Sequence, residues 1–272
     1  MKIKRSTSRQ TSKLPPPAPQ FTNTSSPLRS NSLTPAVIDE WDPPTFSALT
    51  KAASLPIIAE SGVRINFGAL FVRQRIVVVF IRHFWCPLCQ DYMSSVASLT
   101  RSIPDLIVGR SSRGDVLDPE KEATNEKAVT EGVELEPSSV KVVVISNGSY
   151  TMIGKYKQIF GAGALEVYTD PSLAVYAALG MGKDPTRGGR SKSAGAGAGS
   201  GGYVKHGLMG GIAMVFVRAL KVGMPVWEKG GDLNQLGGEF VFGPGLVCTY
   251  AHRMQTTKGH APFEEVLRAA GI

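Results

Sequence analysis

Runs of β-branched and other apolar residues mark the expected strands of this chain. The strongest covers residues 75–84 (RIVVVFIRHF) and is almost continuously apolar at its centre, as is typical of a central strand covered on both faces. Residues 141–146 (KVVVIS) form a second run of this kind. Partial alternation over 63–71 predicts a half-buried strand, and 165–168 predicts a short one.

Helical patterns separate these strands and follow them. The expected helices cover residues 45–53, 90–103, 150–160, 172–179, 204–220 and 262–270. Between the last two, residues 238–242 and 246–250 flank the turn Gly243-Pro244-Gly245 and predict a β-hairpin. An order of strand, helix, strand, helix and strand indicates an α/β layer fold with crossover connections.

Composition narrows the class of protein. The 272 residues are 42% hydrophobic, which is enough to bury a core without disulfide staples. Three cysteines exclude a secreted disulfide framework. The longest strongly apolar run, Ile76 to Ile81, is far shorter than the roughly 18 residues of a membrane span, so we expect no transmembrane segment.

The positive charge of the chain lies mostly in its N-terminal tail. Of the formal net charge of +8, six charges precede the first acidic residue, Asp39, and come from Lys2, Lys4, Arg5, Arg9, Lys13 and Arg29. The remainder is close to neutral, so the sequence shows no electrostatic footprint for nucleic acid. Residues 1–36 are rich in Ser, Thr and Pro and predict a disordered tail without a secretory signal. Its prolines argue against an amphipathic transit peptide, so we expect a cytoplasmic rather than a mitochondrial protein.

The rest of the chain predicts one domain over residues 37–272 with two insertions. Residues 105–138 carry nine acids against four bases and indicate a solvated insertion. Residues 182–202 form a low-complexity Gly-rich loop. Gly197, Gly199 and Gly202 fit G-x-G-x-x-G, but no strand precedes them, so we expect no nucleotide site.

The pair Cys86 and Cys89 forms a C-x-x-C motif at the junction of the strongest strand and a helix. A structural zinc site would need two more ligands, and His83, His206, His252 and His260 contain no H-x₃₋₅-H pair. We therefore expect no metal. Two unreactive cysteines on a helix are the plainer alternative, and a redox dithiol is the functional one.

The position of the motif favours the dithiol. Unsatisfied N–H groups and the positive dipole end of a helix N-terminus stabilise a thiolate, and Pro87 suits the first helical residue. Cys86 is then expected to be partly exposed and to attack, while Cys89, one turn further on, closes a disulfide. Arg82 and His83 could add positive charge, although strand alternation places them on opposite faces. Trp85 is expected to pack beside the site.

The same stretch resembles a known family. Phe80-Ile81-Arg82-His83-Phe84-x-Cys86-x-x-Cys89-x-x-Tyr92 is similar to the peroxiredoxin-like 2 family of the AhpC/TSA antioxidant enzyme superfamily, although the peroxiredoxin pattern P-x-x-x-T-x-x-C is absent. Further landmarks of the resemblance are Thr169-Asp170-Pro171, Gly231-Asp232-x-x-Gln235-Leu236-Gly237-Gly238-x-Phe240-Val241-Phe242, His252-Arg253-Met254 and His260-Ala261-Pro262.

The resemblance implies a thioredoxin-like fold, with a central mixed β-sheet flanked by helices, and a thiol-dependent antioxidant oxidoreductase. Cys86 would be the attacking thiol and Cys89 its resolving partner, acting on a peroxide or disulfide substrate with an external thiol reductant and without metal, flavin or nucleotide. The alternative is a non-catalytic thioredoxin-fold module for regulation or protein interaction. We expect Cys248, His252 and His260 to be structural.

Overall fold

The computed structural model describes residues 39–103, 106–107, 140–161, 165–184, 215, 217–225 and 227–272. The predicted disordered tail at 1–36 lies outside the described residues. So do the predicted insertion from residue 108 onward and the Gly-rich loop from residue 185 onward. Two residues of the expected insertion, Leu106–Ile107, form the short strand β4.

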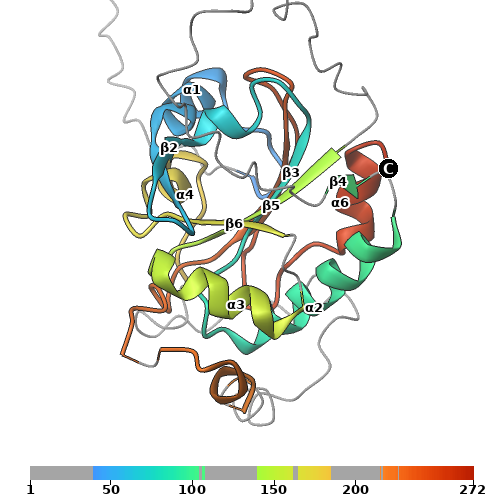
Figure 1. Cartoon of the computed structure of the whole chain (residues 1–272). Helices are drawn as coiled ribbons and strands as arrows, with labels where there is room; N and C mark the ends of the chain where they lie inside the picture. Colours follow the sequence, from blue (N-terminus) through green and yellow to red (C-terminus); the bar gives the residue numbers. More distant parts are fainter. Residues whose placement is uncertain are drawn as a thin grey trace, which may run out of the picture. The chain divides into compact units, whose positions relative to one another are not determined.

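A single mixed sheet organises the domain (Figure 1). Its strands lie in the order β2-β1-β6-β5-β3-β7-β8, and β4 pairs with β5. The strands β5 and β6 run parallel to β3, whereas β7 is antiparallel to β3 and β8 is antiparallel to β7. The strand bounds are β1 Pro56–Ala59, β2 Arg64–Asn66, β3 Ile76–Phe80, β5 Val140–Ser146, β6 Glu166–Thr169, β7 Gly238–Phe242 and β8 Cys248–Arg253.

This topology is the predicted thioredoxin-like fold. The central strand β3 is followed, after a six-residue connection, by a long helix. A parallel strand, β5, pairs with β3 on one side, and the antiparallel pair β7 and β8 lies on the other side and is followed by the last helix. All five residues of β3 have no exposed surface, which explains why its sequence is apolar and β-branched rather than alternating.

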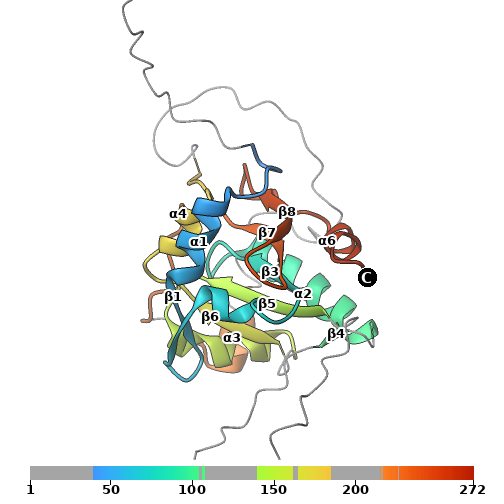
Figure 2. The same cartoon turned by 90° about the horizontal axis from the view of Figure 1, so that it is seen from above.

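Helices cover both faces of the sheet (Figure 2). One core lies beneath α2, α3 and α6, and the other lies beneath α1, α4 and the 3₁₀ turn η1. Alternate residues of β3 divide between them: Val77 and Val79 face the first core, Ile76 and Val78 the second. The bounds are α1 Phe46–Ser54, η1 Phe67–Leu70, α2 Pro87–Ser102, η2 Tyr150–Met152, α3 Ile153–Ile159, α4 Ala174–Ala178 and α6 Phe263–Ala269, and residues 217–222 are also helical.

One predicted strand is wrong. Residues 63–71 divide into β2 and η1, because Phe67 and Leu70 turn into the core three residues apart, a helical and not a strand spacing. The sequence analysis also missed β1, a strand of only four residues that directly follows α1. Together β1 and β2 form a hairpin at the edge of the sheet beside β6.

Candidate functional site

The C-x-x-C motif begins helix α2 directly after the central strand. Cys86 is the N-cap of α2, and its Sγ accepts a hydrogen bond from the backbone N–H of Cys89 at 3.3 Å. Its carbonyl accepts the first helical bond, from Gln90 N at 3.0 Å. Pro87 occupies the first turn, where a missing N–H costs nothing. The sulfur therefore takes the place of the oxygen of a Ser or Asp cap.

Both sulfurs of the motif are buried, which corrects the expectation that Cys86 is partly exposed. Cys86 is 1% exposed and Cys89 is 0% exposed. A segment remote in sequence, residues 227–236, returns across the start of α2: Gly230 O accepts a bond from Phe84 N at 3.0 Å. A Cβ added to Gly230 would lie 1.9 Å from Cδ1 of Trp85, so the backbone of this segment contacts the half-buried indole directly.

Arg82 reaches the sulfur of Cys86. Its Nη1 lies 3.5 Å from Cys86 Sγ, while Nη2 and Nε donate to the carbonyls of Leu233 and Gln235 at 2.7 and 3.3 Å. Because β3 ends at Phe80, strand alternation no longer governs these positions. His83 is also buried, and its Cβ packs against Gly231.

The two thiols differ in acidity. The pKa of Cys86 is lowered from about 9 to about 6, first by a hydrogen bond from the Cys89 thiol, and further by the Arg82 charge and the Cys89 N–H, against the effect of burial. The pKa of Cys89 is raised well above its ordinary value, chiefly by burial and then by its bond to Cys86. None of the three cysteines forms a disulfide, and the opposite pKa shifts favour the thiolate at Cys86 and the thiol at Cys89.

His260 lies beside Cys89 and connects it to a buried carboxylate, Glu239, and through that to His252, a cluster that the sequence analysis did not predict. His260 Nε2 is 3.5 Å from Cys89 Sγ, and His260 Nδ1 is 2.5 Å from Glu239 Oε1. The other oxygen of Glu239 lies 2.7 Å from His252 Nδ1. Burial raises the pKa of Glu239, but the histidines outweigh this effect and lower it to about 2. The sequence feature that could have indicated this cluster is Glu239, the single charged residue of the buried strand Gly238–Phe242.

Cys248 lies apart from this site. It packs against the core under α1 and α4, whereas Cys86 and Cys89 belong to the core on the opposite face of the sheet. Its Sγ donates to Tyr250 O at 3.1 Å, and burial raises its pKa to about 12.

Within the described residues, no group of three or more His, Cys, Asp or Glu side chains is arranged to hold a metal ion. His206 and the glycines at 197–202 lie outside the described residues.

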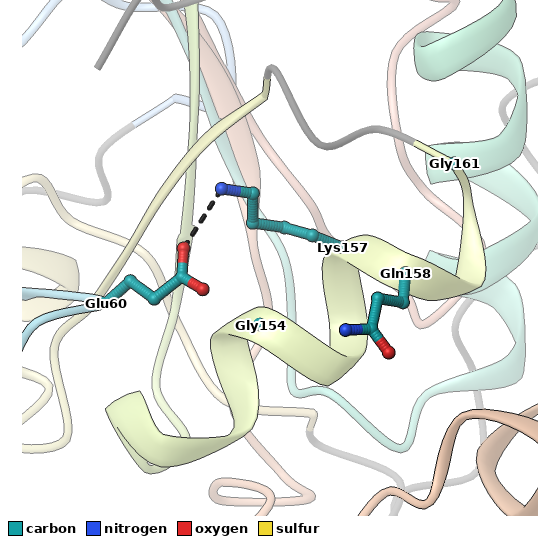
Figure 3. Close-up of a pocket in the computed structure, with 5 residues that line it drawn as sticks. All are labelled: Glu60, Gly154, Lys157, Gln158 and Gly161. Atoms are coloured by element: carbon teal, nitrogen blue, oxygen red, sulfur yellow. Dashed lines mark hydrogen bonds and ion pairs between the residues drawn. The ribbon is translucent and has the colours of Figure 1, made fainter. Parts of the chain in front are cut away.

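Two surface cavities are lined by residues other than the cysteines of the motif. One, of about 750 Å³, adjoins the segment 227–232 and is lined by Asn147, Tyr150, Trp227 and Asp232 among others. Asn147 Oδ1 there accepts from Asp232 N at 2.9 Å. The other, of about 460 Å³, lies at helix α3 and is crossed by the ion pair of Glu60 and Lys157 at 3.0 Å (Figure 3). No cysteine lines this second cavity.

Comparison with known proteins gives three findings on family. The model of the AhpC/TSA antioxidant enzyme family matches residues 131–256, a region that begins after the C-x-x-C motif. Human Peroxiredoxin-like 2C is 30% identical over 222 residues, covering 81% of this chain and 79% of that protein. The mouse protein of the same name is 29% identical over 222 residues, with coverage of 81% and 79%.

Among solved structures, this chain is similar to the peroxidoxin BcpB from Mycobacterium tuberculosis. The two share 10% sequence identity, with a TM-score of 0.42, over 80% of this chain and 91% of the other.

Within the part of the chain that the structure describes, no helix is both long and apolar enough to cross a bilayer.

Proposed function

The chain belongs to the peroxiredoxin-like family of AhpC/TSA antioxidant enzymes, and on this premise we propose that it is a thiol-dependent oxidoreductase in which Cys86 attacks and Cys89 resolves. The observation that carries the proposal is the asymmetry of the pair. Cys86 caps the helix with its pKa lowered to about 6, while Cys89 keeps its proton. A thiolate is the nucleophile of cysteine chemistry, so the attacking residue at neutral pH is Cys86.

The reaction with a peroxide runs in three steps. The Cys86 thiolate attacks one peroxide oxygen, the S–O bond forms, the O–O bond breaks, and the departing alkoxide or hydroxide takes up a proton. Cys89 then attacks the sulfenic sulfur, which forms the disulfide and releases water. An external thiol reductant supplies two electrons and two protons to restore both thiols. Arg82, 3.5 Å from the sulfur, is placed to stabilise negative charge on the departing oxygen.

The burial of the site favours a small oxidant. Cys86 is 1% exposed, and the segment 227–236 crosses the start of α2. A hydroperoxide can diffuse into such a site through small fluctuations, whereas the disulfide of a folded protein would need the segment to move away. We therefore propose a small peroxide rather than a protein disulfide as the substrate. An external thiol must reduce the Cys86–Cys89 disulfide after each turnover. We therefore also propose that the protein works in the cytoplasm, where thiols are kept reduced.

A non-catalytic thioredoxin-fold module for protein interaction is the second candidate. The burial of both cysteines supports it, because an inert scaffold has no need for an accessible sulfur. The lowered pKa of Cys86 argues against it, because an apolar structural thiol would have a raised pKa, as Cys248 has.

The two candidates differ in the rate at which hydrogen peroxide oxidises the reduced protein. We expect the second-order rate to exceed that of free cysteine and to follow the thiolate fraction of Cys86. The rate should fall about tenfold per pH unit well below pH 6 and be level above about pH 7. Cys86→Ser should abolish the reaction. A rate no higher than that of free cysteine, or one that rises only near pH 9, would establish the scaffold instead.

A further inference from the structure

A buried chain of hydrogen-bonded groups runs from Cys89 in α2 to His252 in strand β8. It passes from Cys89 Sγ to His260 Nε2 at 3.5 Å, from His260 Nδ1 to Glu239 Oε1 at 2.5 Å, and from Glu239 Oε2 to His252 Nδ1 at 2.7 Å. The four residues come from α2, the loop before α6, β7 and β8, and each is less than a tenth exposed. Such a set of charged and polar groups inside the core costs folding free energy unless every contact is satisfied.

The ionised carboxylate fixes which nitrogen of His260 holds the proton. Glu239 can only accept hydrogen bonds, and it does so from Ala261 N at 3.2 Å as well as from the two imidazoles. His260 therefore donates from Nδ1, and in the neutral ring Nε2 is left as the acceptor. That acceptor is the nitrogen that faces the sulfur of Cys89.

In the second step of the proposed reaction, Cys89 needs a group that accepts its proton. In the reduced protein a hydrogen bond from the Cys89 thiol lowers the pKa of Cys86, which favours the Cys86 thiolate as its partner. Once Cys86 carries an oxygen, this anionic partner is gone, yet Cys89 must lose its proton to become a nucleophile. Burial keeps the thiol protonated, and with the side chain 0% exposed, bulk water does not reach it.

From this geometry we infer that His260 is the catalytic base for the attack of Cys89 on oxidised Cys86. Glu239 orients the imidazole and stabilises it once it has taken up the proton. The inference rests on the proposed function and assigns the proton transfer in its second step. The Cys89 proton passes to His260 Nε2 and leaves a thiolate and an imidazolium paired with Glu239. The thiolate forms the S–S bond, the S–O bond of Cys86 breaks, and the leaving hydroxide takes the proton from His260 as water.

The position of His260 is fixed by packing as well as by charge. The ring of Tyr92, one turn after Cys89 on α2, stacks on the imidazole with centroids 4.2 Å apart and an interplanar angle of 5°. The titratable groups near His260 include Glu239 from β7, Cys89 and Tyr92 from α2, Cys86 at the cap of α2 and, beyond Glu239, His252 from β8. The ring of His252 packs against that of Trp41, with centroids 4.5 Å apart, and its Nδ1 lies 2.7 Å from the second oxygen of Glu239, so its role is to hold the carboxylate.

The test separates the two steps by rapid mixing of the reduced protein with one equivalent of hydrogen peroxide. A dimedone-type probe reports sulfenic acid, and acid-quenched intact mass reports disulfide. In His260→Asn, Cys86 should be oxidised at a rate within about threefold of wild type, because the thiolate and Arg82 remain. Closure of the disulfide should slow by about 10²–10⁴-fold, and sulfenic acid should accumulate.

The pH profile of closure gives a readout that a purely structural role would not change. In wild type the closure rate should become level at high pH, because His260 accepts the proton of Cys89 inside the protein. In His260→Asn it should keep rising about tenfold per pH unit, because hydroxide must then ionise Cys89 directly. Glu239→Gln keeps an oxygen acceptor but removes the charge, so closure should slow by at least about tenfold. His252→Asn, the matched variant on the other carboxylate oxygen, should slow closure less than Glu239→Gln does.

Each outcome decides one point. Closure at the wild-type rate in His260→Asn would overturn the inference and leave the proposed function intact. If His260→Asn does not fold, Glu239→Gln and the wild-type pH profile decide, and a wild-type rate that rises without becoming level would also overturn it. If wild type forms neither sulfenic acid nor disulfide, the proposed function itself fails, and the role of His260 fails with it.

Discussion

At the scale of single residues, Arg82 contacts Cys86, the thiol that we propose to be the nucleophile. After the hydrogen bond from the Cys89 thiol, the charge of Arg82 does most to lower the pKa of Cys86. The guanidinium also holds two carbonyls of the segment 233–235. One side chain therefore both stabilises the thiolate and fixes the segment that lies over it.

Arg82→Met should raise the pKa of Cys86 by about one unit, because the neighbouring positive charge is removed. The measurement is thiolate absorbance at 240 nm against pH in the Cys89→Ser, Cys248→Ser background, compared with the same background carrying Arg82. Arg82→Lys is the matched control: it keeps the charge and loses part of the hydrogen bonding, so the titration midpoint should stay closer to that of the parent. An unchanged midpoint in Arg82→Met would show that Arg82 acts only on the backbone.

Cys248→Ser should leave peroxide oxidation unchanged. The hydroxyl can make the same bond to Tyr250 O, and the raised pKa of Cys248 leaves no thiolate at neutral pH. The measurement is the stoichiometry of thiol loss per peroxide. A lower stoichiometry or a slower second step in this variant would mean that Cys248 takes part in resolution.

At the scale of elements, the junction of β3 and α2 is covered by the segment 227–236. The backbone of Gly230 approaches Trp85 so closely that no side chain fits between them. Gly237 approaches the carbonyl of Phe80 in the same way: an added Cβ would lie 1.9 Å from that oxygen. These close approaches join the two sequence-distant segments at the start of α2.

Gly230→Ala should displace this cover and make Cys86 more accessible. The new Cβ would overlap the indole of Trp85, so the segment or the indole must shift. We expect alkylation of Cys86 by iodoacetamide at pH 8 to become faster, with some loss of thermal stability. Gly182→Ala is the control, because a Cβ there meets no atom within 4 Å. Equal alkylation rates in Gly230→Ala and wild type would show that the segment does not limit access.

At the scale of the whole molecule, the sequence predicted the α/β layer order and the position of the C-x-x-C motif, because both are local patterns. The strand 75–84 and the helix after it are visible as an apolar run followed by helical spacing. The burial of Cys86 and the contact of Glu239 with His252 and His260 could not be read in this way. They depend on segments more than ten residues apart in the chain, which only the assembled sheet brings together.

Removal of residues 1–36 should leave the melting temperature almost unchanged, since we predict a disordered tail there. The cut must end before Asp39, because Arg253 donates to the carbonyls of Asp39 and Asp42 at 3.0 and 2.7 Å. A deletion of residues 1–42 is the matched comparison and should be clearly destabilised. A fall of more than about 4 °C after removal of 1–36, equivalent to about 1 kcal/mol, would show that the tail packs on the domain.

The most direct test of the central claim is intact mass after one equivalent of hydrogen peroxide. We predict that wild type loses two hydrogens through the Cys86–Cys89 disulfide, and that Cys89→Ser gains one oxygen at Cys86, because nothing nearby can resolve it. Cys86→Ser should keep its mass. If Cys89→Ser stays unmodified while Cys86→Ser reacts, the assigned roles are reversed. If neither wild type nor Cys89→Ser changes mass faster than free cysteine is oxidised, the chain is no thiol oxidoreductase.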